Sequence, residues 1–394
     1  MKKLLLLGGS AQQIVAIKTA KNQGYYTVLC DFLRDNPGQY EADKFYLVST
    51  TDKNAVLNVA KKEKIDGILA YASDPAAPTA AYVAEQLGLP TNPFNSVHIL
   101  CNKDKFRIFL KENGFNAPTS KGYSDKNIDI SIFSLPVIIK PVDSSGSKGA
   151  TVLRDWNKLD EACDFAFSYS RSHRIIIEEY IEKKHEYLIG GDVFVYNGKI
   201  ILWGLLNCHR DMSVNSLVPV GKSYPLLIEK KDELEVQNTL QRLIDTLGIQ
   251  FGSVNVELII DKSGRVWPID VGPRAGGNMI PDLLGLIFGV DVVEMAVLTS
   301  MGENIKNEVH KGTPFYATHN LHTSQTGLYK YIEFSDELEG FIIKKCLYKK
   351  IGDQVDYFDN AAKALGIIFM KFDDEYQMSN ILSRINSLYK VVIE

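Results

Sequence analysis

The chain has 394 residues, of which 45% are hydrophobic and 23% charged, and a formal net charge of −4. This composition is typical of a globular protein with two or three domains, since a single core rarely grows beyond about 250–300 residues. The charge excludes a broad basic surface for nucleic acid, and no continuous apolar run approaches the roughly 20 residues of a membrane span, so we expect neither partner. Five scattered cysteines without CxxC spacing are typical of a reducing cytoplasm and argue against a structural zinc site.

The first ninety residues alternate strands with helices. Apolar runs predict four strands, at residues 4–7, 26–30, 45–48 and 67–70. Helical patterns predict two helices, at residues 11–22 and 55–63. Strands separated by helices form a parallel sheet covered on both faces, which binds ligands beyond the carboxyl ends of its strands. The loops Gly8-Gly9-Ser10 and Ser73-Asp74 lie at that edge, and Asp74 is a candidate substrate contact.

A cluster of breaking residues at Leu89–Pro93 marks the first predicted domain boundary. A helix is predicted from Lys103 to Asn113, with Gly114 in the usual stop position. Strands with a few helices follow to about residue 301, and further short strands and a closing helix over 375–388 end the chain. The predicted domains are residues 1–92, 93–302 and 303–394.

The stretch from Pro136 to Gly149 carries a lysine at the end of an apolar strand, followed directly by a loop of serines and glycines. Such a loop lets backbone N–H groups approach phosphate oxygens, while Lys140 and Lys148 supply positive charge. The spacing differs from that of a P-loop, whose lysine ends the loop. A flexible linker is the alternative, but it leaves the lysine on the strand unexplained.

A second apolar strand, from Arg174, runs into an acidic pair, and Glu186 follows a few residues later. A strand that ends in a linker offers backbone donors and acceptors to a purine edge, and a carboxylate beyond it can accept both ribose hydroxyls. This segment alone does not decide between a nucleotide contact and a solvated acidic turn.

The segment from Val254 to Gly277 predicts a hairpin with one acidic residue on each strand. Glu257 lies in the first apolar run, Asp270 ends the second, and an Asp-Lys-Ser-Gly turn joins them. A hairpin places such residues side by side, so the two carboxylates can share a hard divalent cation, with Arg274 in reach of a phosphate. Solvated carboxylates at the hairpin end are the alternative interpretation.

The substrate pocket leaves weaker signals. Arg210 lies in a polar stretch between two apolar segments and is a candidate clamp for a substrate carboxylate, with a solvated arginine as the alternative. His319 and His322 are three apart in a strand-like run, so we expect them on different faces and not as a metal pair.

The order of these elements resembles the ATP-grasp superfamily, in particular carboxylate–amine ligases of the phosphoribosylglycinamide synthetase, biotin carboxylase and D-alanine–D-alanine ligase type. The resemblance covers nearly the whole chain. It implies a mixed α/β and α+β fold: a parallel α/β domain before the grasp, two α+β lobes that enclose ATP, and a C-terminal α+β part.

The resemblance also implies roles for individual residues. Lys103 and Lys140 match the lysines that contact ATP phosphates, Glu257 and Asp270 the magnesium ligands, and Arg274 an arginine near the γ-phosphate. The loop that covers the phosphates matches Ser144, Ser145, Gly146, Ser147, Lys148 and Gly149. The hinge that contacts adenine matches Glu178, Glu179, Tyr180 and Ile181. The carboxylate that binds the ribose matches Glu186. Two positions depart from the family pattern: Asp270 stands where glutamate is usual and Gly272 where asparagine is usual, which implies a weaker or water-completed second magnesium site.

The function implied by this resemblance is ATP-dependent ligation. ATP and Mg²⁺, with Mn²⁺ as an alternative ion, would activate a small carboxylate as an acyl-phosphate, and an amine would displace the phosphate. A bicarbonate-activating carboxylase and a catalytically silent ATP-binding regulatory protein stay open as alternatives. We expect small-molecule carboxylate and amine partners, a cytoplasmic location and, by resemblance only, a homodimer.

Overall fold

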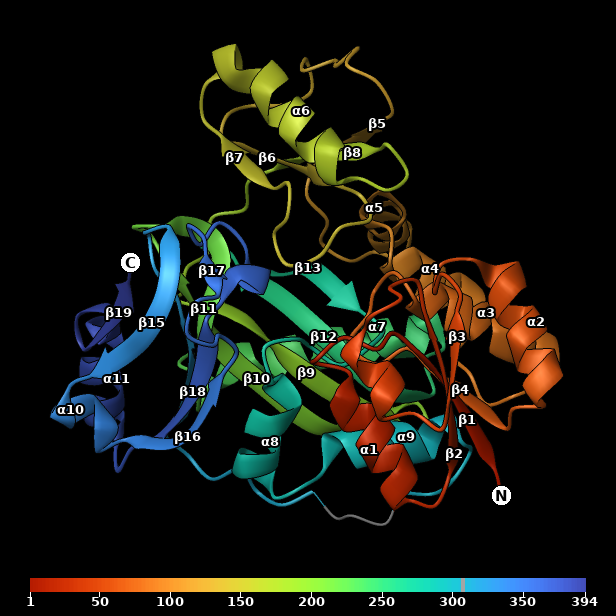
Figure 1. Ribbon diagram of the computed structural model, residues 1–394. Coiled ribbons are helices and arrows are strands. Elements are labelled where there is room, and N and C mark those ends of the chain that lie inside the picture. Colours follow the sequence, from red (N-terminus) through yellow and green to blue (C-terminus); the bar gives the residue numbers. More distant parts are fainter. Residues whose placement is uncertain (306–308) are drawn as a thin grey trace.

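The computed structural model describes residues 1–305 and 309–394, and its described part contains four sheets (Figure 1). A small lobe of sheet and helix stands apart at the top of the view, above a larger body that holds both chain ends. Residues 306–308, inside the predicted C-terminal part, lie outside the described residues. The mixed α/β and α+β fold class expected from the sequence is confirmed.

The N-terminal sheet is parallel throughout, with the strand order β3-β2-β1-β4, as the alternation of strands and helices predicts. Leu5 and Leu7 pack toward one side, and Leu4 and Leu6 toward the other, so both faces of β1 are buried. The elements are β1 (Lys3–Leu7), α1 (Ile14–Asn22), β2 (Tyr26–Asp31), β3 (Lys44–Leu47), α2 (Lys53–Glu63), β4 (Gly67–Leu69) and α3 (Ala77–Leu87). Helix α1 begins three residues later than predicted, because the Gln13 side chain binds the Leu7 and Tyr71 carbonyls and holds the preceding turn.

The small lobe is an antiparallel sheet of order β5-β8-β6-β7 covered by one helix. Two helices lead into it, and the predicted helix at Lys103 is confirmed to within one residue of its end. The elements are α4 (Phe94–Leu100), α5 (Lys103–Glu112), β5 (Ser120–Tyr123), β6 (Val137–Pro141), β7 (Thr151–Leu153), α6 (Leu159–Tyr169) and β8 (Ile175–Glu179). The lobe therefore has its own core beneath α6.

The largest sheet has eight strands in the order β13-β12-β9-β10-β11-β14-β18-β16. One face packs on α5 and α7, and the other on α8 and α9. The elements are β9 (Leu188–Tyr196), β10 (Lys199–Asp211), β11 (Asn215–Tyr224), α7 (Lys230–Leu247), β12 (Phe251–Ile260), β13 (Val266–Gly272), α8 (Ile280–Phe288), α9 (Val292–Ser300), β14 (Tyr316–Leu321), β16 (Ile342–Leu347) and β18 (Gly366–Lys371). The C-terminal segment thus completes the central sheet, while the predicted domain limits themselves stay predictions.

A three-stranded sheet, β17-β15-β19, and two short helices finish the chain. The predicted closing helix over 375–388 is too long: it ends at Ser383, and Ile385–Ser387 form a 3-10 turn. The chain turns there because the following segment must pair with β15, and tertiary pairing outweighs the helical pattern. The elements are β15 (Gly327–Phe334), α10 (Asp336–Glu339), β17 (Gln354–Val355), α11 (Glu375–Ser383) and β19 (Tyr389–Ile393).

Among the described residues no single helix is long and apolar enough to cross a membrane. Helices α8 and α9 pass that test only as a pair, and they are bent by 109° at the break between them.

The β12–β13 hairpin has the register that its sequence predicts, with Glu257 directly opposite Asp270. Its turn is organised by Asp261, whose carboxylate accepts the backbone N–H groups of Ser263 and Arg265 at 2.9 and 3.0 Å and the Trp267 indole N–H at 2.9 Å. Burial raises the pKa of Asp261, but these hydrogen bonds outweigh it, and the pKa is lowered. The ionised side chain therefore stabilises the hairpin.

We predict that Asp261→Ala lowers the free energy of unfolding by about 2–3 kcal/mol at pH 7, because hydrogen bonds to a buried charge are lost. The folded pKa lies below the unfolded value of about 3.9, so the contribution is complete above that value and lost as pH falls. Urea unfolding should show the gap between wild type and variant narrowing between about pH 5 and pH 1. Glu182→Ala, which removes an exposed partner of Lys262, is the matched control; a gap that does not change with pH would contradict the assignment.

Candidate active site

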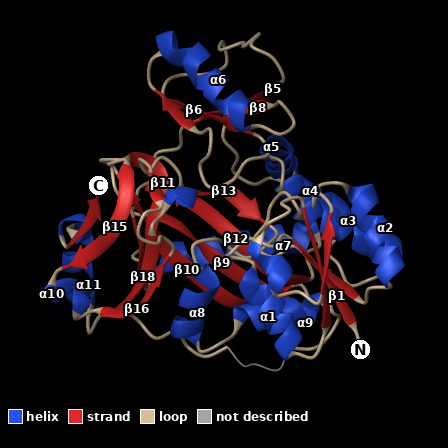
Figure 2. Ribbon diagram, viewed as in Figure 1, coloured by secondary structure: helices blue, strands red, loops and turns tan. Residues whose placement is uncertain are grey.

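Several of the predicted site residues make contact between the small lobe and β13, above which that lobe stands (Figure 2). Lys103, at the start of α5, approaches Asp270 on β13 with Nζ to Oδ2 at 3.3 Å. The same ammonium donates to the Ser144 carbonyl at 2.9 Å. A small cavity is lined by these three residues together with Asp74, Leu100, Cys101 and Asp143. One lysine thus joins the serine-glycine loop of the small lobe to the acidic hairpin of the large sheet.

Both predicted metal ligands are paired with cations in this structure. Glu257 forms an ion pair with Arg210, in which Arg210 Nη2 lies 3.1 Å from Glu257 Oε1, and Asp270 forms an ion pair with Lys103. Burial raises the pKa of Asp270, but Lys103, Lys140 and further cations outweigh it, and the pKa is lowered. Asp270 is therefore ionised at neutral pH, as a metal ligand must be. The pairing also places the predicted substrate clamp, Arg210, against a predicted metal ligand.

Lys140 is buried at the end of β6 and pairs with Glu178 on β8, with Nζ to Oε2 at 2.7 Å. Arg107, one turn beyond Lys103 on α5, pairs with the same carboxylate, with Nε to Oε1 at 2.8 Å. Burial raises the pKa of Glu178, but Arg107 and Lys140 together hold it below its ordinary value. The sequence interpretation missed Arg107, although its position four residues after Lys103 on a predicted helix places both on one face.

The predicted phosphate loop spans the gap between the lobes. Gly146, Ser147 and Gly149 have positive φ values, a conformation that glycine adopts without strain. Ser147 Oγ donates to the Leu217 carbonyl on β11 at 2.8 Å, so the loop contacts the large sheet. Ser145 is half-buried and Lys148 is exposed. The loop is held at one end by Lys103 and at its middle by β11.

The predicted adenine hinge divides into buried and exposed parts. Glu178 belongs to β8, and its side chain is engaged by Lys140 and Arg107. Glu179 is exposed and accepts the Thr119 N–H at 3.2 Å, while Tyr180 and Ile181 follow the strand and are half-buried. Glu186 is exposed on the segment before β9. The nucleotide roles of these residues stay predictions.

Arg274 is tied to the N-terminal domain. Its Nε and Nη2 donate to the two Asp74 carboxylate oxygens at 2.8 and 2.5 Å, a bidentate pair. Gly272 explains how Asp74 reaches this position: a Cβ on residue 272 would lie 2.8 Å from Asp74 Oδ1. The glycine at position 272 therefore makes room for a carboxylate from the loop after β4, and Asp74 and Arg274, predicted separately, form one unit.

A buried carboxylate beside this unit was not found from the sequence. Asp192 on β9 accepts the Gly276 N–H at 2.7 Å and the Asn255 side-chain amide at 2.8 Å. Burial raises the pKa of Asp192, and these hydrogen bonds only partly oppose it. Asp192 thus holds the glycine turn after Arg274 in place.

The two histidines do not lie on different faces, so that expectation is wrong. Their ring centroids are 5.4 Å apart, because His322 lies beyond the end of β14 and its chain has left the strand alternation. His322 Nε2 is 2.9 Å from Asp211 Oδ2, and His319 Nε2 is 3.3 Å from the Tyr389 hydroxyl. No three His, Cys, Asp or Glu side chains in the described part of the chain are grouped to hold a metal.

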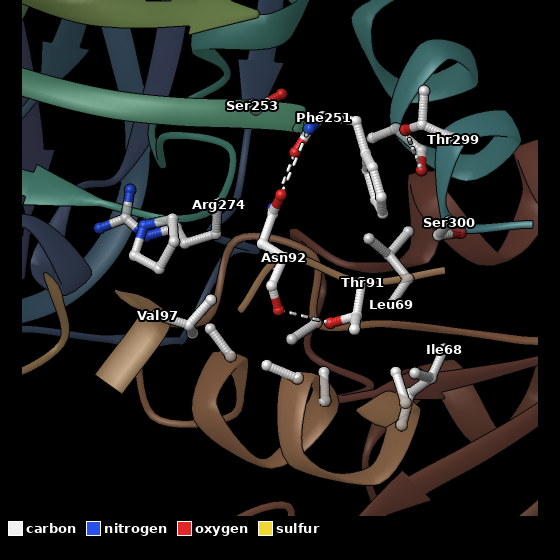
Figure 3. A pocket seen from close by; sticks show the side chains of 18 of the residues that line it. Ile68, Leu69, Thr91, Asn92, Val97, Phe251, Ser253, Arg274, Thr299 and Ser300 are labelled. Carbon is white, nitrogen blue, oxygen red and sulfur yellow. Dashed lines mark hydrogen bonds between the residues drawn. The ribbon is translucent and has the colours of Figure 1, made fainter. Parts of the chain in front are cut away.

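A second cavity, of about 90 Å³, lies between the N-terminal domain and the large sheet (Figure 3). It is bordered by Arg274, Ser253, α3, α9 and the linker at Thr91 and Asn92. The Ser253 hydroxyl is buried and has no hydrogen-bond partner among the described residues. Apart from Arg274, the side chains that line this cavity carry no charge.

The residues present fit a magnesium nucleotide. Each cation of the site is paired with a carboxylate, and Lys140 and Arg107 share Glu178. Arg107 Nη1 is buried without a hydrogen-bond partner among the described residues, so it can donate to an additional anion. Two carboxylates on one hairpin suit Mg²⁺, which keeps waters and takes phosphate oxygens as its remaining ligands.

We predict that Gly272→Ala lowers the free energy of unfolding by about 1–3 kcal/mol, because the added methyl group displaces Asp74 and breaks its bidentate contact. Urea unfolding measures the loss. Gly340→Ala is the control, since a Cβ there has its nearest atom at 3.5 Å and the φ of −62° suits alanine. Equal stability of the two variants would show that the Asp74 contact with Gly272 is not tight.

Parts of the chain are similar to known proteins. Residues 133–282 match the family model of the ATP-grasp domain. Formate-dependent phosphoribosylglycinamide formyltransferase of Prochlorococcus marinus (strain NATL2A) is 31% identical over 189 residues, which are 46% of this chain and 48% of that protein. The chain therefore spans about half the length of this curated relative.

Two solved structures have the same fold over the whole chain. L-amino acid ligase from Bacillus licheniformis superposes with a TM-score of 0.81 at 17% identity, covering 100% of this chain and 99% of that one. Phosphoribosylglycinamide synthetase from Anaerococcus prevotii gives a TM-score of 0.76 at 21% identity, covering 100% of both chains. At these identities the likeness concerns the fold alone.

Proposed function

We propose that this chain, which belongs to the ATP-grasp superfamily, is an ATP- and magnesium-dependent ligase that activates a small carboxylate as an acyl-phosphate and joins it to an amine. The observation that carries this proposal is the convergence on Lys103. Its ammonium touches both the loop predicted to cover the phosphates and the carboxylate predicted to hold the metal. Residues with three predicted roles, from α5, from the loop over residues 144–149 and from β13, are therefore in contact here.

The chain's own residues divide the work of phosphoryl transfer. Lys103 and Lys140 would bind the phosphates, and the loop over residues 144–149 would exclude water that otherwise hydrolyses the activated acid. Glu257 and Asp270 would hold Mg²⁺, which, when bound, neutralises charge that develops on the transferring group. Arg274, oriented by Asp74, would stabilise the same charge from the side of the N-terminal domain.

Arg210 would bind the substrate carboxylate once a metal ion takes over Glu257. The Arg210 side chain is 15% exposed, and its guanidinium lies beside the hairpin, so it can contact an acid placed next to the phosphates. Small-molecule acids and amines are therefore the proposed partners. A homodimer and a cytoplasmic location stay predictions.

Two alternatives remain distinct from this proposal. A bicarbonate-activating carboxylase would use the same machinery on a smaller acid. A catalytically silent nucleotide-binding protein would bind ATP at the same place without turnover.

The proposal is tested by incubating the protein with Mg·ATP and a panel of carboxylates and amines, including bicarbonate, glycine and other amino acids, and measuring ADP and phosphate. Release that requires both an acid and an amine supports the ligase. Release with bicarbonate alone supports the carboxylase, and ATP binding without release under any combination supports the silent protein.

We predict that Glu257→Gln lowers turnover at least about 100-fold, because the amide removes a negative charge from the metal site. The product assay above gives the rate, and circular dichroism checks that the variant is folded. Glu333→Gln on β15 serves as a control for a strand carboxylate outside the site. Full activity of Glu257→Gln would contradict the metal role.

We predict that Arg274→Ala lowers kcat by about 100- to 1000-fold while changing the ATP KM much less, because its charge acts on the transferring group. Steady-state kinetics with varied ATP separate the two parameters. A large rise in KM with unchanged kcat would make Arg274 a simple binding residue.

A further inference from the structure

We propose that Arg107 is a positioning residue that holds Glu178 in a permanent ion pair, so that Lys140 can leave Glu178 and bind nucleotide phosphate. This inference rests on the proposed function, since it concerns the response of the site to ATP. It assigns a role to a side chain that lies outside every predicted phosphate, hinge and metal motif.

The geometry places one buried carboxylate between two cations. Glu178 is 2% exposed. Its Oε1 lies 2.8 Å from Arg107 Nε, and its Oε2 lies 2.7 Å from Lys140 Nζ and also accepts a hydrogen bond from Arg107 Nη2 at 3.4 Å. The contact between Arg107 Nε and Glu178 Oε1 is an ion pair without an aligned hydrogen bond, so these two atoms keep unused hydrogen-bonding capacity. Glu178 therefore has one partner that can move away and one that can stay.

Arg107 is fixed where it lies. It is 2% exposed on α5, and its Nη2 donates to the Ile269 carbonyl at 2.6 Å. Ile269 directly precedes Asp270 on β13, so this guanidinium connects α5, the small-lobe strand β8 and the acidic hairpin. A lysine at position 107 could not make both contacts, because an ammonium lacks the planar fork of arginine.

Glu178 is buried, so its charge needs a counter-ion in place of water. A buried carboxylate that loses its partner carries a cost of several kcal/mol, enough to oppose the transfer of Lys140 to a phosphate. With Arg107 in place, Glu178 stays neutralised after Lys140 departs. Without Arg107, Lys140 becomes the sole counter-charge of Glu178, and ATP must compete with that pair.

The test is a double-mutant cycle on ATP affinity, measured by isothermal titration calorimetry of the full chain without acid or amine. Arg107→Met should weaken ATP binding at least about tenfold, because Lys140 is retained by Glu178. Glu178→Gln is the second single variant, and its own affinity is the reference for the double variant, because Glu178 lies in the predicted adenine hinge. The double variant should bind ATP to within about threefold of Glu178→Gln, because the competing charge has gone, and a purely structural role of Arg107 would not produce this recovery.

Arg242→Met is the control for replacing an arginine by methionine on a helix, at an exposed position. Arg242 also lies on a helix against the same core, where it stacks on Phe115 at 3.9 Å and donates to the Gly114 carbonyl, so it reports general damage without touching the nucleotide residues. If Arg107→Met does not fold, Arg107→Lys takes its place, and its smaller loss of affinity should likewise be reversed by Glu178→Gln.

The outcomes separate this inference from the proposed function. Wild-type protein that does not bind ATP contradicts both. Wild-type binding with Arg107→Met within twofold of it overturns the role of Arg107 alone. A double variant that binds ATP more than about threefold more weakly than Glu178→Gln also overturns it, because the loss then does not arise from Glu178.

Discussion

The site depends on the cross-strand register of the β12–β13 hairpin, which sets Glu257 opposite Asp270. Because side chains alternate along a strand, a slip of one residue would turn one of these carboxylates into the core that contains Val256 and Leu258. The Asp261 turn fixes that register through five hydrogen bonds to one side chain. Every other charged group is arranged around the two acids that the hairpin presents.

The cations of the site come from segments far apart in the chain, and each has a carboxylate partner. Lys103 pairs with Asp270, Lys140 and Arg107 with Glu178, Arg210 with Glu257, and Arg274 with Asp74. Such pairing keeps these charges neutralised. When a magnesium nucleotide binds, these charged side chains would exchange their present partners for the metal ion and the phosphates, with little new ordering. Phosphoryl transfer requires such a preorganised site.

The sequence predicted the parts of the fold that depend on local patterns. Four parallel strands, the hairpin and the helix at Lys103 follow from apolar periodicity and turn residues, and the structure has all of them. The closing helix was predicted too long, because only the pairing of β19 with β15 ends it at Ser383. The histidines were misplaced for a similar reason: strand alternation no longer holds once the chain leaves β14 before His322.

The site residues were predictable as a set, but their partners were not. Lys140, Glu257 and Asp270 stand out because a charge in or at the end of an apolar run needs an explanation, and Arg274 stands out because it follows the acidic hairpin directly. Arg107 and Asp192 do not stand out, because nothing local distinguishes a buried, paired charge from a solvated one on a helix or strand. From the sequence alone, Gly272 suggests a missing metal ligand. In the structure, Asp74, which lies 198 residues earlier in the chain, occupies the space that a side chain at position 272 would need.

The most direct test of the central claim is a crystal structure of the protein with magnesium and a non-hydrolysable ATP analogue. The account predicts a terminal phosphate between Lys140 and the hairpin, with a metal ion bound by Glu257 and Asp270 and with Arg274 facing the same phosphate. A nucleotide bound elsewhere, or bound here with both carboxylates still paired to Lys103 and Arg210, would contradict it.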